Sequence, residues 1–188
     1  MRQGDGVWSS ADGSVRYEGQ WHAGQKHGRG KFVSVGQASY VGEFKLGLME
    51  GTGILLHDDG QKYEGNFRSG LKHGTGRLVF ADGSIYDGFF VNDLMQGRGA
   101  LTHADGTQLR GCFHEGFLEG HGEQLSETSV QYVGEWKGGK FHGAGILRTQ
   151  AGDVFDGKFA LGMPMGQGSW SLADGTNDAV ANATNNHI

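Results

Sequence analysis

The sequence contains very little cysteine and proline. Of its 188 residues, one is Cys and one is Pro. A single thiol cannot close a disulfide within the chain, so the fold does not depend on an oxidising compartment. A collagen helix is also excluded, because it needs abundant proline and a glycine at every third position.

Long apolar runs and an excess of basic residues are missing as well. No stretch approaches the ~20 apolar residues of a membrane-spanning helix, and the opening residues do not resemble a signal peptide. Acidic residues outnumber Lys and Arg by 21 to 16, and the net charge is −5. Nucleic-acid binding needs a concentrated basic face and is not expected. We therefore expect a cytoplasmic protein.

Glycine and aromatic residues are abundant instead. The chain has 37 Gly, and aromatic residues make up 11 % of it. Glycine is thus about three times as frequent as its usual ~7 %. Disorder does not fit a chain in which aromatic residues recur at fixed places.

These residues repeat every 23 positions. The string Tyr17-Glu18-Gly19-Gln20-Trp21 returns six times in related form, always with glycine at its centre, and a G-x-G string follows each copy. Leu109 and Phe155 replace the leading Tyr. The repeated aromatic positions are Tyr17, Trp21, Tyr40, Phe44, Tyr63, Phe67, Tyr86, Phe90, Phe113, Tyr132, Trp136, Phe155 and Phe159.

Each repeat is predicted to form a β-hairpin. Alternation with period two places Tyr17, Gly19 and Trp21 on one face of the first strand. A turn is expected from Gly24 to His27, and Asp-Gly pairs such as Asp59-Gly60 reverse the chain toward the next repeat. A strand glycine normally weakens a sheet, but here it lets a ring lie against bare backbone. We expect the rings of one hairpin to rest over the backbone of the next.

The predicted fold is therefore all-β. It is an elongated linear array of about seven and a half hairpin repeats that form one twisted, open sheet. The array covers residues 1–175, with a half repeat at 4–8 and full repeats that start at 17, 40, 63, 86, 109, 132 and 155. The half repeat suggests a fragment of a longer array. Residues 176–188 are predicted to be a polar tail, either frayed or a loose cap.

The pattern Y-x-G-x-[WF]-x-x-G-x-x-x-G-x-G resembles the MORN (membrane occupation and recognition nexus) repeat. The best matches run from Tyr17 to Gly30 and from Tyr63 to Gly76. The resemblance implies a scaffold or adaptor of the cytoskeleton or of its boundary with membranes, which fits a cytoskeleton-associated location. It further implies dimerisation, as in some protist cytoskeletal members of the family.

No catalytic, cofactor-binding or metal site is predicted. Gly134–Lys140 and Gly152–Lys158 mimic a phosphate loop, but Phe follows each where a magnesium-binding hydroxyl is needed. His27 and its equivalents are interpreted as structural turn residues, because Glu, Gln or Met fill that position in other repeats. A metal or disulfide bridge between two chains through Cys112 stays open as an alternative. The array is not expected to be an enzyme.

One row of apolar residues is not required by a hairpin. These residues follow each leading aromatic by eight positions, where a turn ought to face water. They either fold inward and cap the next hairpin or form an exposed ridge; in the second case the ridge or the aromatic face docks a partner helix or a second copy. The ridge positions are Leu48, Leu71, Leu94, Phe117 and Met163.

Self-association is the protein contact that we favour for the array. An open sheet edge is a template for pairing, and the last repeat is rich in adaptable apolar groups, so a homodimer through the C-terminal repeats is expected. Two other functions stay open: a phospholipid-binding module and the repeat region of a larger enzyme. Lipid binding is weakly supported, by the cations Lys26, Arg29, Lys31, Lys72 and Arg77. The dimer candidates are Leu161, Met163, Met165 and Trp170.

Overall fold

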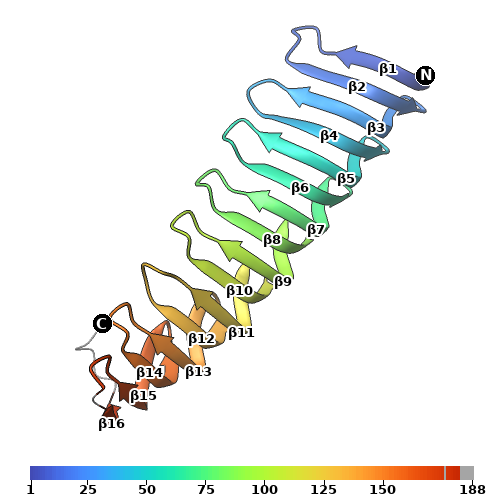
Figure 1. Cartoon of the computed structure of the whole chain (residues 1–188). Coiled ribbons are helices and arrows are strands. Elements are labelled where there is room, and N and C mark those ends of the chain that lie inside the picture. Colours follow the sequence, from blue (N-terminus) through green and yellow to red (C-terminus); the bar gives the residue numbers. More distant parts are fainter. Residues whose placement is uncertain (176, 183–188) are drawn as a thin grey trace. The chain divides into compact units, whose positions relative to one another are not determined.

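The computed structural model describes residues 1–175 and 177–182 of the chain (Figure 1). This part of the chain is all-β and contains no helix, as the repeat pattern predicts. Accordingly, it has no helix long and apolar enough to cross a membrane. The strands are β1 (Gly4–Ser9), β2 (Val15–His22), β3 (Gln25–Ser34), β4 (Ala38–Lys45), β5 (Leu48–His57), β6 (Lys62–Arg68), β7 (Leu71–Val79), β8 (Ile85–Val91), β9 (Leu94–Thr102), β10 (Gln108–His114), β11 (Phe117–Leu125), β12 (Gln131–Lys137), β13 (Lys140–Arg148), β14 (Val154–Ala160), β15 (Met163–Ser171) and β16 (Asn177–Asn182).

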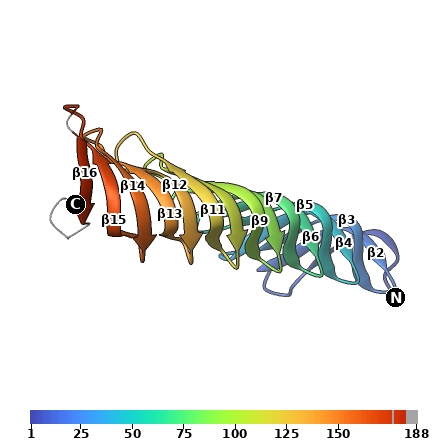
Figure 2. The ribbon, with the colours of Figure 1, turned by 90° about the horizontal axis from the view of Figure 1, so that it is seen from below.

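The strands divide into two compact units, Met1–Leu94 and Met95–Ile188. In the first unit, successive strands from β1 to β8 pair antiparallel with one another. In the second, β9 to β16 do the same, and Figure 2 shows β11 to β15 side by side in chain order. Both units are thus linear arrays of hairpins, which confirms the predicted fold class.

The last strand lies in the segment predicted as a polar tail. β16 pairs with β15, with Asn177 opposite Ser171 and Asn182 opposite Gln167. These residues extend the sheet by one strand. Residue 176 and residues 183–188 of the predicted tail lie outside the described part of the chain.

The turns are tighter than the sequence suggested. β2 ends at His22 and β3 already begins at Gln25, so only Ala23 and Gly24 form the loop. Both have positive φ, 48° and 80°. Two left-handed residues in succession make the turn whose twist matches that of a hairpin. The expected turn from Gly24 to His27 is therefore wrong, and Lys26 and His27 belong to the second strand.

A β-bulge follows each of these turns. In β2 and β3, Gly19 faces Gly30 but the next residue, Gln20, faces His27, so the second strand carries extra residues. Gly28 lies in the bulge with φ of 56°, and its equivalents in the other repeats have φ between 54° and 75°. A glycine in the left-handed region is the usual first residue of such a bulge, which bends the strand. This explains the first glycine of each G-x-G string.

The second glycine of the string accommodates a ring. A Cβ added to Gly30 would lie 2.5 Å from the Tyr17 hydroxyl oxygen, and one added to Gly19 would lie 2.7 Å from it. Tyr17 thus covers the two paired glycines of its own hairpin. The expectation that rings rest over the backbone of a neighbouring hairpin is therefore wrong for the leading tyrosines, although Trp21 and Trp136 do approach Gly6 and Gly122 of the adjacent hairpin. Contact with the next hairpin comes from Phe44, whose ring meets Tyr17 edge-on at 5.1 Å.

The rings form an edge-to-face series along β2 to β8 and another along β12 to β14. Tyr40 contacts Phe44 of its own hairpin at 5.0 Å and Phe67 of the next at 5.1 Å, and Tyr132 repeats the pattern with Trp136 and Phe159. Such contacts add ~0.5–1.5 kcal/mol each to the burial of the rings. All thirteen repeated aromatic residues are buried, with at most 8 % of their surface exposed.

Candidate functional site

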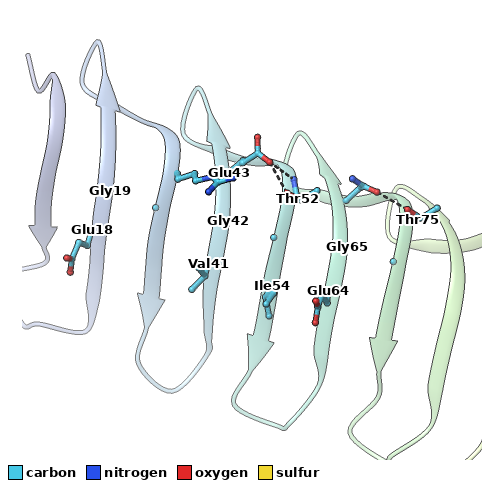
Figure 3. A pocket seen from close by; sticks show the side chains of 15 residues that line it. Glu18, Gly19, Val41, Gly42, Glu43, Thr52, Ile54, Glu64, Gly65 and Thr75 are labelled. Atoms are coloured by element: carbon cyan, nitrogen blue, oxygen red, sulfur yellow. Dashed lines mark hydrogen bonds between the residues drawn. The ribbon is translucent and has the colours of Figure 1, made fainter.

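An open groove of about 890 Å³ crosses β2 to β7 in the first unit (Figure 3). Glycine pairs form its floor, because Gly19 faces Gly30 and Gly42 faces Gly53 across their hairpins. We call it the outward groove, since its side chains alternate in sequence with the buried rings. It is lined by Glu18, Gly19, Arg29, Gly30, Val41, Gly42, Glu43, Thr52, Gly53, Ile54, Glu64, Gly65, Asn66, Thr75 and Gly76.

The groove has two walls of different chemistry. Period-two alternation places the residues before and after each glycine on the same outward side of the strand. Glu18, Val41, Ile54 and Glu64 form one row, and Glu43, Thr52 and Thr75 belong to the row across the glycines (Figure 3). The first wall thus sets two apolar side chains between carboxylates, whereas the second is polar.

Hydrogen bonds order the polar wall. A carboxylate oxygen of Glu43 accepts the Thr52 backbone N–H at 3.0 Å and the Thr52 hydroxyl at 2.9 Å. The Thr75 hydroxyl contacts the Asn66 amide oxygen at 3.0 Å. The backbone and side-chain bonds from Thr52 lower the pKa of Glu43. Glu43 is therefore ionised at neutral pH and holds a negative charge beside the glycine floor.

The predicted ridge residues lie at the first position of the second strands. Between 40 % and 59 % of the surface of each is exposed. Leu48 and Phe117 also approach the next turn, since a Cβ added to Gly70 or Gly139 would lie 3.9 Å or 3.4 Å from them. These residues thus cover part of the neighbouring turn and keep about half of their surface free.

The residues that follow the ridge turn inward instead. Leu118 is buried and Phe141 stacks on Tyr132, with ring centroids 3.9 Å apart. In the repeat that begins at Leu109, a Cβ added to Gly111 would meet Leu118 at 2.8 Å. Leu118 therefore fills the space that a tyrosine ring occupies in other repeats. The sequence did not distinguish it from the exposed ridge.

The dimer candidates of the last repeat differ in exposure. Leu161, Met163 and Met165 are exposed by 75 %, 55 % and 52 %. Trp170 is half-buried and packs against Phe155 at 5.1 Å. Three of the four side chains are thus available at the surface of the second unit.

The cations considered for lipid binding do not gather on one face. Lys26 lies on the ring side, the face of the sheet that carries the buried aromatic residues. Its ammonium is 4.3 Å from the Phe32 ring, and burial lowers the pKa of Lys26. Lys72 lies on the same side near Tyr63 and pairs with Asp93 at 3.3 Å. By contrast, Arg29 lines the outward groove. A concentrated basic surface does not result.

In other repeats the residue at the position of His27 joins neighbouring hairpins. Oxygens of Glu50, Gln96 and Glu119 accept backbone N–H groups of the next turn at 2.8, 3.0 and 2.7 Å. These bonds join successive hairpins at their turns. Among the described residues, Nδ1 of His27 and of His73 is buried without a hydrogen-bond partner.

The other chemical candidates from the sequence are dispersed. Gly134 and Gly157 lie within β12 and β14 and not in a loop that could hold phosphate. Cys112 is exposed on β10. Within residues 1–175 and 177–182 no group of three His, Cys, Asp or Glu side chains could hold a metal ion. The outward groove is the feature that sequence reasoning missed, although the alternation of the strands already separates its residues from the rings.

Two solved structures are similar to this chain. The TCP domain of Drosophila melanogaster SAS-4 (dCPAP), solved in complex with a proline-rich motif of Ana2 (dSTIL), is 10 % identical, with a TM-score of 0.49 over 95 % of this chain and 89 % of that one. The TCP10 domain of Danio rerio CPAP, solved with a peptide of STIL, is 14 % identical, with a TM-score of 0.35 over 93 % and 87 %. No curated protein matches the sequence.

The repeat motif itself is matched by a family. The MORN repeat matches residues 17–37, 40–62, 63–85, 86–108, 110–127, 132–154 and 155–177. These segments have the period and nearly the starting points of the hairpins described above, and they cover most of the chain. The chain belongs to the MORN repeat family.

Proposed function

We propose that this chain is a non-catalytic scaffold that binds other proteins through its outward groove. The observation that carries the proposal is the shape and lining of the groove: bare glycine backbone along the floor, with apolar and charged side chains in the walls. Such a surface offers an extended segment both burial and charge pairing. The ring side leaves little aromatic surface for binding a partner, because the aromatic rings are already buried.

The chemistry of the groove favours binding over catalysis. Catalysis requires polar groups that converge on one reacting atom. Here Glu43 and Asn66 each engage a threonine of their own wall, and the walls lie apart across the glycine floor. These contacts make a long binding surface rather than a reaction centre.

A peptide-display library selected on the full chain tests this function. Thr52→Trp fills the middle of the groove, whereas Asp58→Trp places the same side chain on an exposed turn outside it. Selected peptides should lose binding to Thr52→Trp and keep it to Asp58→Trp, with the β-type circular dichroism of both variants unchanged. A selection that enriches no peptide, or only peptides indifferent to Thr52→Trp, would contradict the proposal.

A second proposal is self-association through the last repeat. It is supported by the exposed side chains of Leu161, Met163 and Met165, which form an adaptable apolar surface. Size-exclusion chromatography with multi-angle light scattering should give a dimer mass that Met163→Asp with Met165→Asp reduces to that of a monomer. Leu46→Asp, at an exposed turn of the first unit, is the control. A monomer at every concentration would end this proposal.

A cytoskeletal role is the setting that we propose for this scaffold. It is supported by the kinship with the MORN family and by the linear arrays of hairpins, which present surface along their length. Co-sedimentation of the chain with polymerised cytoskeletal filaments should detect it. Binding to anionic vesicles without binding to filaments would favour the phospholipid alternative instead.

A further inference from the structure

Two repeats differ from the others on the outward face. In three repeats, opposite charges face each other across the hairpin next to the glycine pair: Glu18 and Lys31, Glu64 and Arg77, and Arg110 and Glu123. In the repeats that begin at 40 and 132, apolar residues face each other there: Val41 and Ile54, and Val133 and Ile146. Each unit therefore contains one apolar pair.

These apolar pairs are exposed. Val41 and Ile54 have 51 % and 38 % of their surface free, and Val133 and Ile146 have 44 % and 48 %. The aromatic core lies on the other side of the strands, so the pairs contribute nothing to it. Exposed apolar pairs at positions where sister repeats use charges indicate contact with a partner.

A carboxylate accompanies each pair on the same face. Glu43 lies across Gly42 from Val41, and Glu135 lies across Gly134 from Val133. Glu43 accepts the Thr52 N–H at 3.0 Å, and Glu135 accepts the Ala144 N–H at 3.3 Å, so both carboxylates are held in place over a strand. A carboxylate has capacity for further hydrogen bonds, and a Lys or Arg side chain is the natural donor.

We propose that each apolar pair and its carboxylate form one docking spot, and that the chain holds two copies of the same short peptide motif, one per unit. The ligand is an extended segment in which an apolar residue is followed directly by Lys or Arg. In an extended segment that follows the glycine floor, successive side chains point to opposite walls. The apolar one then covers Val41 and Ile54 while the basic one reaches Glu43.

Charge complementarity supports this occupant. In the outward groove, Glu18 and Glu64 are paired with Arg16 and Lys62, whereas Glu43 faces Arg29 but forms no ion pair within 4.0 Å among the described residues. In the second unit, Glu123 and Asp156 face Val133 and Ile146 from the neighbouring hairpins. Lys31 faces Val41 and Arg110 pairs with Glu123, so the groups that favour a basic ligand are the carboxylates of Glu43 and Glu135, which have no ion pair in the described part of the chain. The inference rests on the proposed function, because it assumes that the outward face binds protein.

The test uses the full chain and a synthetic peptide of alternating Val and Lys. Methyl resonances of the valine and isoleucine side chains report binding at each spot, and calorimetry reports stoichiometry. We expect two peptides per chain, with shifts at Val41, Ile54, Val133 and Ile146. Peptides of alternating Val and Glu, or of Ser and Lys, should bind at least about tenfold more weakly.

Charge-pair variants distinguish the two spots. Val41→Glu with Ile54→Arg converts the second repeat to the Glu–Arg arrangement that the third repeat already has in Glu64 and Arg77. Its stoichiometry should fall from two to one, with the second unit unaffected; Val133→Glu with Ile146→Arg should do the converse. Both variants retain the ring side, and β-type circular dichroism verifies their folding.

A further variant is designed to gain a binding spot for the Val–Lys peptide. Glu64→Val, Asn66→Glu and Arg77→Ile together should add a third spot in the third repeat. Absence of binding by the Val–Lys peptide, or a stoichiometry that the charge-pair variants leave unchanged, would overturn the inference. If library peptides still bind the wild-type chain and lose binding to Thr52→Trp, the proposed function survives that result, so the two failures are distinguishable.

Discussion

Each repeat contains two kinds of glycine with different physical roles. The first glycine of the G-x-G string has a left-handed backbone and makes the bulge, as Gly74 does with φ of 75°. The second has extended backbone and leaves room for a ring, as Gly76 does beneath Tyr63. Ring burial and backbone shape therefore depend on separate residues.

Adding a methyl group under a ring should destabilise the fold strongly. A Cβ at Gly65 would lie 2.5 Å from the Gly76 Cα and 2.6 Å from the Thr75 carbonyl oxygen. Backbone atoms cannot yield as a flexible side chain does, so Gly65→Ala should cost about 3 kcal/mol or more. Chemical denaturation measures it, with the neighbouring exposed Glu64→Ala as a control expected within ~1 kcal/mol of wild type. Equal stability of the two variants would contradict this packing.

The buried tyrosines predict a loss of stability in alkali. Burial raises the pKa of Tyr40, Tyr63 and Tyr132 from 10.0 to about 12. The unfolded chain loses these protons at lower pH than the folded chain does. Their contribution is thus complete below pH ~10 and is lost as the pH rises toward 12.

Denaturation at several pH values, followed by tyrosinate absorbance, measures this effect. Tyr63→Phe removes the hydroxyl that bonds to the Asn66 carbonyl oxygen at 2.9 Å, and it should reduce the slope of stability against pH. Phe155 takes the same position in the seventh repeat. Free titration of the tyrosines near pH 10 in the folded chain would count against their burial.

At the scale of the element, the hairpin is defined by a two-residue turn and a bulge. Both need left-handed residues, and the turn accepts non-glycine residues such as Ala23 and Leu46 at its first position. Glu50, Gln96 and Glu119 then bind the following turn and fix one hairpin to the next. The hairpin is thus a local structure that gains its stability from its neighbours.

The requirement of the bulge for a left-handed residue can be tested at a glycine whose added Cβ would meet no other atom. Gly120 has φ of 72°, and an added Cβ would meet no atom within 4 Å. Gly120→Ala should therefore report backbone strain alone, at about 1–2 kcal/mol. Gly120→Asn should recover part of the loss, since Asn tolerates the left-handed region. Identical unfolding midpoints for wild type and Gly120→Ala would show that the bulge does not require this conformation.

At the scale of the whole molecule, each unit is a series in which a strand contacts its immediate neighbours. Stability in such arrays is a sum of hairpin terms and nearest-neighbour terms, so damage should stay local. Gly134→Ala places a Cβ 2.5 Å from the Gly145 Cα and should loosen β12 and β13. Hydrogen exchange should show faster exchange there and unchanged protection in β4 and β5. A uniform loss across both units would instead indicate one cooperative fold.

The sequence by itself determined the architecture of this protein. The 23-residue period, the alternation of Tyr17, Gly19 and Trp21, and the Asp-Gly pairs sufficed for an all-β array of hairpins. They sufficed because every interaction involved is local: each hairpin pairs within itself and with its immediate neighbour.

Only the tertiary structure decided how the side chains are used. The double positive φ at Ala23 and Gly24 places the turn earlier than the sequence suggested, so Lys26 lies in the second strand, with its ammonium over the Phe32 ring. It also decided that Tyr17 covers its own hairpin, that Leu118 is buried while Phe117 is exposed, and that an outward groove exists. These outcomes depend on where the bulge bends the strand, because Gln20 faces His27 and leaves Gly28 and Arg29 without a partner residue in β2.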